Sequence, residues 1–237
     1  MRRIRPILAI PMAALLFACN NSGTTEETKA ADTTAAAAPA EVKPVFKPYK
    51  VLTIQTKVKN FGKWHDQFLA DDSLRKAYGI SDYMIGRDDK DSNMVYVVAK
   101  MEDMDKAMTF SKSPALKEAG KMASVVRPPA FSYGEVVRTS DEPSSSMNRL
   151  GVSHHVKDYA AWLKVFDAEG ASARGSYGVV DQTIARSLID SNIVYLTFAI
   201  TDTAKARARM MSPDLKKRMD SSGVDSPPTV RWFHFVK

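Results

Sequence analysis

Cysteine is the scarcest residue in this chain, since Cys19 is the only one among 237 residues. The chain after Cys19 therefore has no cysteine for a disulfide, a thiol nucleophile or a zinc–thiolate site. It also lacks a His-x-x-x-His pair, a glycine-rich phosphate-binding loop and a Gly-x-Ser-x-Gly turn. These absences exclude the common motifs of zinc enzymes, nucleotide-binding proteins and serine hydrolases. We expect no metal site and no cofactor.

A hydrophobic run long enough to span a bilayer is missing as well. The uncharged stretch from Ile7 to Ala18 is shorter than the about 20 apolar residues that a spanning helix needs. It has the length of a signal-peptide core, and basic residues precede it at Arg2, Arg3 and Arg5. Residues 1–19 are therefore expected to be an export signal.

The end of this run resembles the lipobox of bacterial lipoproteins, with the sequence Leu16-Phe17-Ala18-Cys19. The resemblance implies that Cys19 is acylated and becomes the new N-terminus after cleavage. Two or three acyl chains hold a protein on a membrane, whereas one chain is marginal. We expect anchoring through Cys19 to a membrane of the bacterial cell envelope, namely the outer membrane. The alternatives are plain secretion and an uncleaved anchor.

Residues 20–48 have no apolar periodicity and are rich in Ala, Thr, Glu and Pro. Such a segment buries too little apolar surface to offset the entropy of ordering it. We interpret it as a flexible tether between the lipid and the folded part.

The rest of the chain contains one pattern twice, at an offset of 98 and, after one inserted residue, 99. We assign a first copy to residues 49–138, a linker to 139–148 and a second copy to 149–237. The matches include Trp64 with Trp162, Phe68 with Phe166, Tyr78-Gly79 with Tyr177-Gly178, Asp91-Ser92-Asn93 with Asp190-Ser191-Asn192, and Ser113-Pro114 with Ser212-Pro213.

Each copy shows the same order of predicted elements, βαββαβ. In the first copy, residues 51–58 alternate as a strand, and Asn60 is a helix N-cap residue followed by aromatics at helical spacing. Strands near 83–87 and 94–99 flank the turn 91–93. A second helix begins after Asp103 and restarts at Pro114, and a last strand covers 131–137. This is the ferredoxin-like unit, an α+β fold with both helices on one face of an antiparallel sheet.

The uncovered sheet face of each copy must be buried against something. Alternation places Leu52, Ile54 and Val58 toward the helices, and Thr53, Gln55 and Lys57 on the other face. We therefore predict that the two copies pack sheet to sheet as an intramolecular α+β barrel, and that the protein is a monomer.

This arrangement resembles the dimeric α+β barrel superfamily, which includes antibiotic-biosynthesis-monooxygenase-like and stress-responsive barrel domains. The resemblance covers residues 49–237 and implies the fold. Its members include cofactor-free monooxygenases, heme-degrading enzymes and isomerases, so the fold alone does not choose an activity. Heme-degrading relatives use a Trp on the third strand and a His on the second helix. Residues 94–99 and 193–199 contain no Trp, and 103–121 and 202–220 contain no His.

The candidate pocket is expected inside the barrel, on the sheet face that points away from the helices. His155 is the preferred ligand or base, because strand alternation places it with Ser153 on the face opposite Val152 and Val156. Its counterpart in the first copy is Lys57, which is also a candidate, so the two halves are not chemically equivalent. His154 is expected to point to the opposite face. The other candidates, each with a structural role as the alternative, are Gln55, Ser153, Arg87, Arg186, Tyr96, Tyr195 and His234.

The expected function is that of an envelope lipoprotein that binds a small molecule in the barrel interior. One alternative is a cofactor-independent monooxygenase or isomerase that uses His155 with Arg186 or Tyr195, and another is a purely structural or interaction module. The sequence does not decide whether the protein is an enzyme, although the missing motifs favour a binding role. Nucleic acid is not expected as a partner of an exported protein.

Overall fold

The first copy forms four strands and four helices in a computed structural model, which describes residues 45–140, 142 and 144–236. Cys19, the signal and the tether up to residue 44 lie outside the described residues. The elements of the first copy are β1 Tyr49–Lys57, α1 Phe61–Ala70, α2 Asp72–Ala77, β2 Ile80–Asp88, β3 Met94–Met101, α3 Met104–Lys112, α4 Pro114–Met122 and β4 Ala130–Thr139.

The second copy repeats this order, so the predicted βαββαβ pattern is confirmed in both halves. The short helices α2 and α6 were not predicted. The elements are β5 Asn148–His155, α5 Tyr159–Glu169, α6 Ala171–Ser176, β6 Val179–Ser187, β7 Ile193–Ile200, α7 Thr203–Met210, α8 Pro213–Ser221 and β8 Thr229–Val236.

Side-chain caps start the helices where the sequence indicated. The Asn60 side chain accepts a hydrogen bond from the Lys63 amide at 2.9 Å, and Asp158 caps α5 in the same way. Ser113 caps α4 directly before Pro114. Each such cap contributes about 1 kcal/mol to helix stability. The same local sequence therefore produces the same helix start in each copy.

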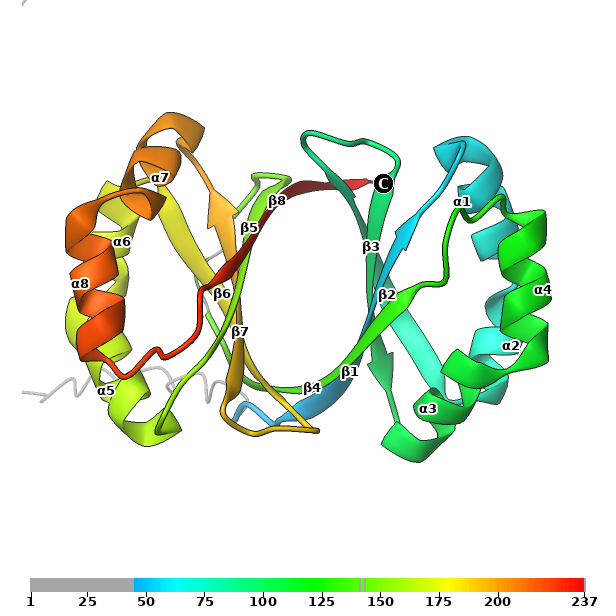
Figure 1. The fold of residues 1–237 in the computed structure, drawn as a ribbon, viewed down its shortest axis with the longest axis horizontal. Coiled ribbons are helices and arrows are strands. Elements are labelled where there is room, and N and C mark those ends of the chain that lie inside the picture. The colour runs from blue at the N-terminus through cyan, green and yellow to red at the C-terminus, as the bar shows by residue number, and fades with distance from the viewer. Residues whose placement is uncertain (1–44, 141, 143, 237) are drawn as a thin grey trace, which may run out of the picture. The chain divides into compact units, whose positions relative to one another are not determined.

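The eight strands close into one antiparallel barrel in the order β1-β3-β2-β8-β5-β7-β6-β4. Two seams join the copies: β2 pairs with β8 from Ile85↔Val236 to Asp88↔Phe233, and β4 pairs with β6. Every edge strand of one copy thus finds a partner in the other, which removes the unpaired edges that invite aggregation. Figure 1 shows the helices of each copy on the outside of its own half of the barrel.

The cores lie between helices and sheet, as the alternation predicted. Leu52 and Val58 are 0% and 1% exposed and pack with Trp64 and Phe68 of α1. Trp162 forms the equivalent core of the second copy at 3% exposure. Within the described residues, none of the helices is both long and apolar enough to cross a bilayer.

Candidate functional site

Several of the predicted residues come together in the barrel interior. Their side chains form hydrogen bonds that link different strands. Gln55 of β1 accepts a hydrogen bond from Arg231 of β8, with 3.1 Å between Nη2 and Oε1. Tyr96 of β3 donates to Asp88 at 3.1 Å, and burial, reinforced by Asp88, raises the pKa of Tyr96 to about 12. Tyr96 therefore stays protonated at neutral pH. Arg231 was not among the residues predicted from the sequence.

Lys57 and His155 play the same structural role at the ends of β1 and β5. The Lys57 ammonium pairs with Asp91 in the β2–β3 turn. His155 Nδ1 lies 2.6 Å from Asp225, and Nε2 lies 3.6 Å from Asp190, the counterpart of Asp91. The hydrogen bond with Asp225 raises the pKa of His155 above its ordinary value. Lys57 and His155 thus both link the end of a strand to an aspartate in a nearby turn. The difference between them does not indicate a single specialised pocket.

For two further predicted residues, both in the second copy, the structure shows only packing or strand pairing. Tyr195 packs with Val51, Val136 and Ala185, and Ser153 lies in register between Thr229 and Tyr195. Neither contact indicates a chemical role.

Three other candidates lie outside the barrel interior, contrary to the prediction. The Arg87 and Arg186 guanidiniums stack on the first aromatic residues of α1 and α5, and each Nε donates at 2.8 Å to a turn carbonyl, of Ser92 or Ser191. They anchor the hairpins through a carbonyl, not through Asp91 or Asp190. His234 alternates with the inward Phe233 and binds Asp89 at 3.2 Å on the outer face.

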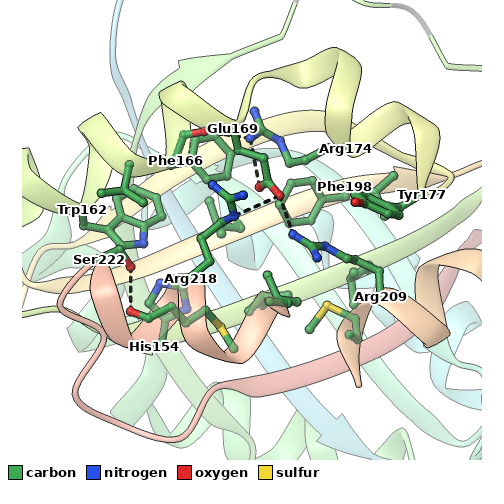
Figure 2. A pocket seen from close by; sticks show the side chains of 18 residues that line it. His154, Trp162, Phe166, Glu169, Arg174, Tyr177, Phe198, Arg209, Arg218 and Ser222 are labelled. Atoms are coloured by element: carbon green, nitrogen blue, oxygen red, sulfur yellow. Dashed lines mark hydrogen bonds and ion pairs between the residues drawn. The ribbon is translucent and has the colours of Figure 1, made fainter. Parts of the chain in front are cut away.

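The second copy contains a cavity of about 100 Å³ between its helices and its sheet, on the opposite face from the predicted pocket. Its volume is somewhat below the ~150 Å³ of an apolar cavity that accepts benzene. Figure 2 shows the side chains that line it. They are mainly apolar or aromatic, with a charged group at one side, and include Leu150, Val152, His154, Trp162, Phe166, Glu169, Arg174, Tyr177, Phe198, Arg209, Met210, Arg218 and Met219.

His154 is the unusual member of this lining. It is 5% exposed, and neither of its ring nitrogens has a hydrogen-bond partner among the described residues. Its ring lies edge-on to Trp162, with centroids 5.7 Å apart. Burial lowers the pKa of His154 to about 4, so the imidazole is neutral at pH 7. A buried polar group without a partner costs about 1–3 kcal/mol, which makes His154 a candidate for ligand contact.

Glu169 organises the charged side of the cavity. Its carboxylate lies 2.7 Å from Arg209 and 3.5 Å from both Arg174 and Arg218. Figure 2 shows it pointing between the Arg209 and Arg218 side chains. Glu169, Arg174 and Arg209 are each 8–9% exposed at the side chain, whereas Arg218 is 38% exposed. Arg218 is thus the member of the group that faces solvent.

Arg218 has unused donor capacity. Its Nε lies at ion-pair distance from Glu169 without forming a hydrogen bond, and its terminal nitrogens have no partner among the described residues. Arg174, by contrast, is bound twice by Asp181, at 2.7 and 2.6 Å, and Arg209 binds Asp214 at 2.6 Å. A planar guanidinium with free donors suits a carboxylate.

The first copy has no histidine or arginine at the positions of His154, Arg209 and Arg218. The residues at these positions are Thr56, Phe110 and Ala119. The buried arginine recurs, since Arg75, like Arg174, donates to the carbonyl of the aromatic residue on which it stacks. An acid also recurs, because Asp71 stands at the position of Glu169. This shared arginine joins two helices, whereas the histidine and the two further arginines are particular to the second copy.

A signal for this site was present in the strand alternation. His154 occupies a position in β5 between Val152 and Val156, where the pattern demands an apolar side chain, and Thr56 breaks the same pattern in β1. In the part of the chain that the structure describes, no group of three or more His, Cys, Asp or Glu residues is placed to hold a metal ion.

The likeness to known proteins lies in the fold. No protein-family model matches the chain, and no curated protein sequence matches it. An anthrone oxidase-like protein aligns over 80% of this chain and 92% of its own, with 13% identity and a TM-score of 0.53. A ferredoxin-fold protein related to antibiotic biosynthesis monooxygenases, from Listeria monocytogenes, aligns over 81% and 97% with 10% identity and a TM-score of 0.47. A monooxygenase-like protein from Listeria innocua aligns over 80% and 95% with 10% identity and a TM-score of 0.44.

Proposed function

Because the chain is a tandem α+β barrel with the fold of the antibiotic-biosynthesis-monooxygenase-like proteins, we propose that it binds a small molecule in the cavity of its second copy. The observation that carries this proposal is the buried, unpartnered His154 in an apolar lining. The proposed pocket is therefore not the barrel interior that the sequence suggested.

The lining defines the class of ligand. Trp162, Phe166 and Phe198 favour a flat apolar ring, and the volume of about 100 Å³ limits the ligand to a single ring. His154 supplies one neutral donor or acceptor for a ring substituent. The free fork of Arg218 at the solvent side holds a carboxylate. The ligand class is thus a single-ring aromatic acid with a polar ring substituent.

Replacing Arg218 with alanine is expected to weaken the binding of 4-hydroxybenzoate by roughly 10- to 100-fold, since hydrogen bonds to charged groups contribute about 1.5–3 kcal/mol. Isothermal titration of the full chain measures this. The neutral amide of the same ring should bind wild type and Arg218→Ala alike. Lys217→Ala, one residue away on α8 and exposed, is the matched control. Equal affinity of both variants for the acid would contradict the proposal.

A second candidate function is a cofactor-independent oxygenase, favoured by the neutral His154 in a water-poor cavity. His154 takes one proton from a methylene next to the ring, and the carbanion adds to dioxygen to give a hydroperoxide, which takes that proton back. Loss of the second methylene hydrogen breaks the O–O bond, so one oxygen atom becomes the product carbonyl and the other leaves as water. The fold likeness to an anthrone oxidase-like protein is compatible with this chemistry. Oxygen uptake with the ring compounds that bind decides between binding and oxidation.

We also propose that the protein acts at the bacterial envelope as a monomer tethered through acylated Cys19. The support is the sequence of residues 1–19 and the closed barrel, in which every strand pairs with two others of the same chain. Residues 20–48 supply the spacer between lipid and barrel.

Cys19→Ser is expected to abolish incorporation of labelled palmitate, because the thiol is the acyl acceptor in lipoproteins with this motif. Labelling in a bacterial host followed by immunoprecipitation measures it. Ser22→Ala, in the same segment, should label as wild type does. A wild-type chain that takes up no label would disprove the tether.

A further inference from the structure

The first copy has a much larger cavity than the second, about 480 Å³ against about 100 Å³, at the same place between helices and sheet. This volume lies within the 300–1,000 Å³ range typical of small-molecule sites. It has no role in the function proposed above, which rests on the second copy alone.

Matched positions explain the difference in volume. Where the second copy has Arg218 and Met219 on α8, the first copy has Ala119 and Gly120 on α4. Thr56 also stands where the second copy has His154. Each pair replaces a large side chain with a small one, so the space is a property of the sequence and not of a distorted sheet.

The walls of the larger cavity are apolar and its mouth is basic. Trp64, Phe68, Val97, Phe110 and Leu116 line its interior. The Thr56 hydroxyl is the one buried oxygen of this lining without a hydrogen-bond partner among the described residues.

The cations stand at the solvent side of the lining. Lys112, Lys117 and Arg127 are exposed, and none has a carboxylate partner in the described part of the chain. Lys121, also at the mouth, pairs with Glu118 at 2.7 Å. The lining contains one acid, Asp71, which accepts a hydrogen bond from Gln67. The mouth therefore has an excess of positive charge over an apolar interior.

We propose that the first copy binds a free single-chain amphiphile with a carboxylate head, such as a fatty acid. Its chain occupies the apolar cavity, and its carboxylate lies among Lys112, Lys117 and Arg127. The apolar walls favour burial of a hydrocarbon chain, and the unpaired cations favour a negatively charged head group. A second, chemically different site thus stands beside that of the second copy.

Gly120→Met tests the chain site by introducing the residue that the second copy has at this position. A β-carbon at Gly120 meets only Val125, at 3.7 Å, and methionine is a better helix former than glycine, so the variant should fold. Titration of the full chain with dansyl-undecanoic acid, followed by fluorescence, is expected to show at least roughly 10-fold weaker binding. Gly175→Met on α6, where the β-carbon meets nothing within 4 Å, is the control and should bind as wild type does.

The head-group site is tested by charge. Dodecanoate is expected to displace the probe from wild type at least roughly 10-fold more effectively than dodecanol does, and Lys117→Gln with Arg127→Gln should remove that preference. Lys205→Gln with Lys217→Gln, exposed on α7 and α8, should retain it. Wild-type affinity in Gly120→Met, or equal displacement by acid and alcohol, would overturn the proposal.

The two sites can be told apart. Arg218→Ala should leave the fatty-acid titration unchanged, and Gly120→Met should leave 4-hydroxybenzoate binding unchanged. If Arg218→Ala instead weakened fatty-acid binding, the fatty-acid site would lie in the second copy. That result would disprove the fatty-acid site of the first copy and leave the proposed function unaffected.

Discussion

Replacing Glu169 with alanine is expected to destabilise the protein by about 3 kcal/mol at pH 7. The change leaves the buried Arg209 and Arg174 guanidiniums without their shared carboxylate, and removing one partner of a buried ion pair typically costs about 3–5 kcal/mol. The lower end applies because both arginines keep a second acid, Asp181 or Asp214. Urea unfolding followed by circular dichroism measures the loss.

The matched control for Glu169 is Asp220→Ala. Asp220 pairs with Lys216 at 2.9 Å, but both side chains are more than 60% exposed, and such surface pairs contribute little. A loss for Glu169→Ala no larger than that of this control would show that the cluster is screened by solvent. It would also remove the reason to regard the cluster as a pre-formed wall of the cavity.

His154→Leu is expected to remove an acid sensitivity of the fold. In wild type the unfolded chain binds a proton at the ordinary histidine pKa of 6.5, whereas the folded chain does so only at about 4. Stability contributed by neutral His154 is therefore full above pH 6.5 and is lost as the pH falls toward 4. The loss reaches roughly 3 kcal/mol, at about 1.36 kcal/mol per pKa unit.

Urea unfolding of wild type and His154→Leu between pH 7 and pH 4 measures this effect. The variant should also equal or exceed wild-type stability at pH 7, because it removes an unpartnered polar group from an apolar cavity. If His154→Leu followed the same profile as wild type, the imidazole would not be desolvated. A more stable variant that no longer binds ligand would indicate that the histidine is kept for function.

Much of the fold could be predicted from the sequence because its determinants are local or repeated. Asn60, Asp158 and the Ser-Pro pairs set helix starts within a few residues of chain. Alternation in residues 51–58 determined which side chains face the helices. The duplication then supplied two half-barrels, and burial of the second sheet face required them to close.

The position of the site could not be predicted in the same way. Strand alternation separated His154 from His155 but did not show which sheet face carries a cavity. Nor did it show how large the cavity between helices and sheet is in each copy, which depends on distant helix residues such as Ala119 in the first copy and Arg218 in the second. Arg231 was missed for a similar reason, since its partner Gln55 lies on the first strand of the other copy.

The β2–β8 seam has a consequence for how the chain acquires its structure. Synthesis completes the whole first copy while β8, residues 229–236, has still to be made. The edge of β2 then presents open backbone donors and acceptors with no partner available within its own copy. Closure of this seam joins residues about 150 positions apart in the sequence, so it is a high-contact-order step that we expect to come after the local pairings within each half. Until Phe233–Val236 dock, β2 is an open edge through which two newly made chains can associate wrongly, as β4 is until β6 pairs with it.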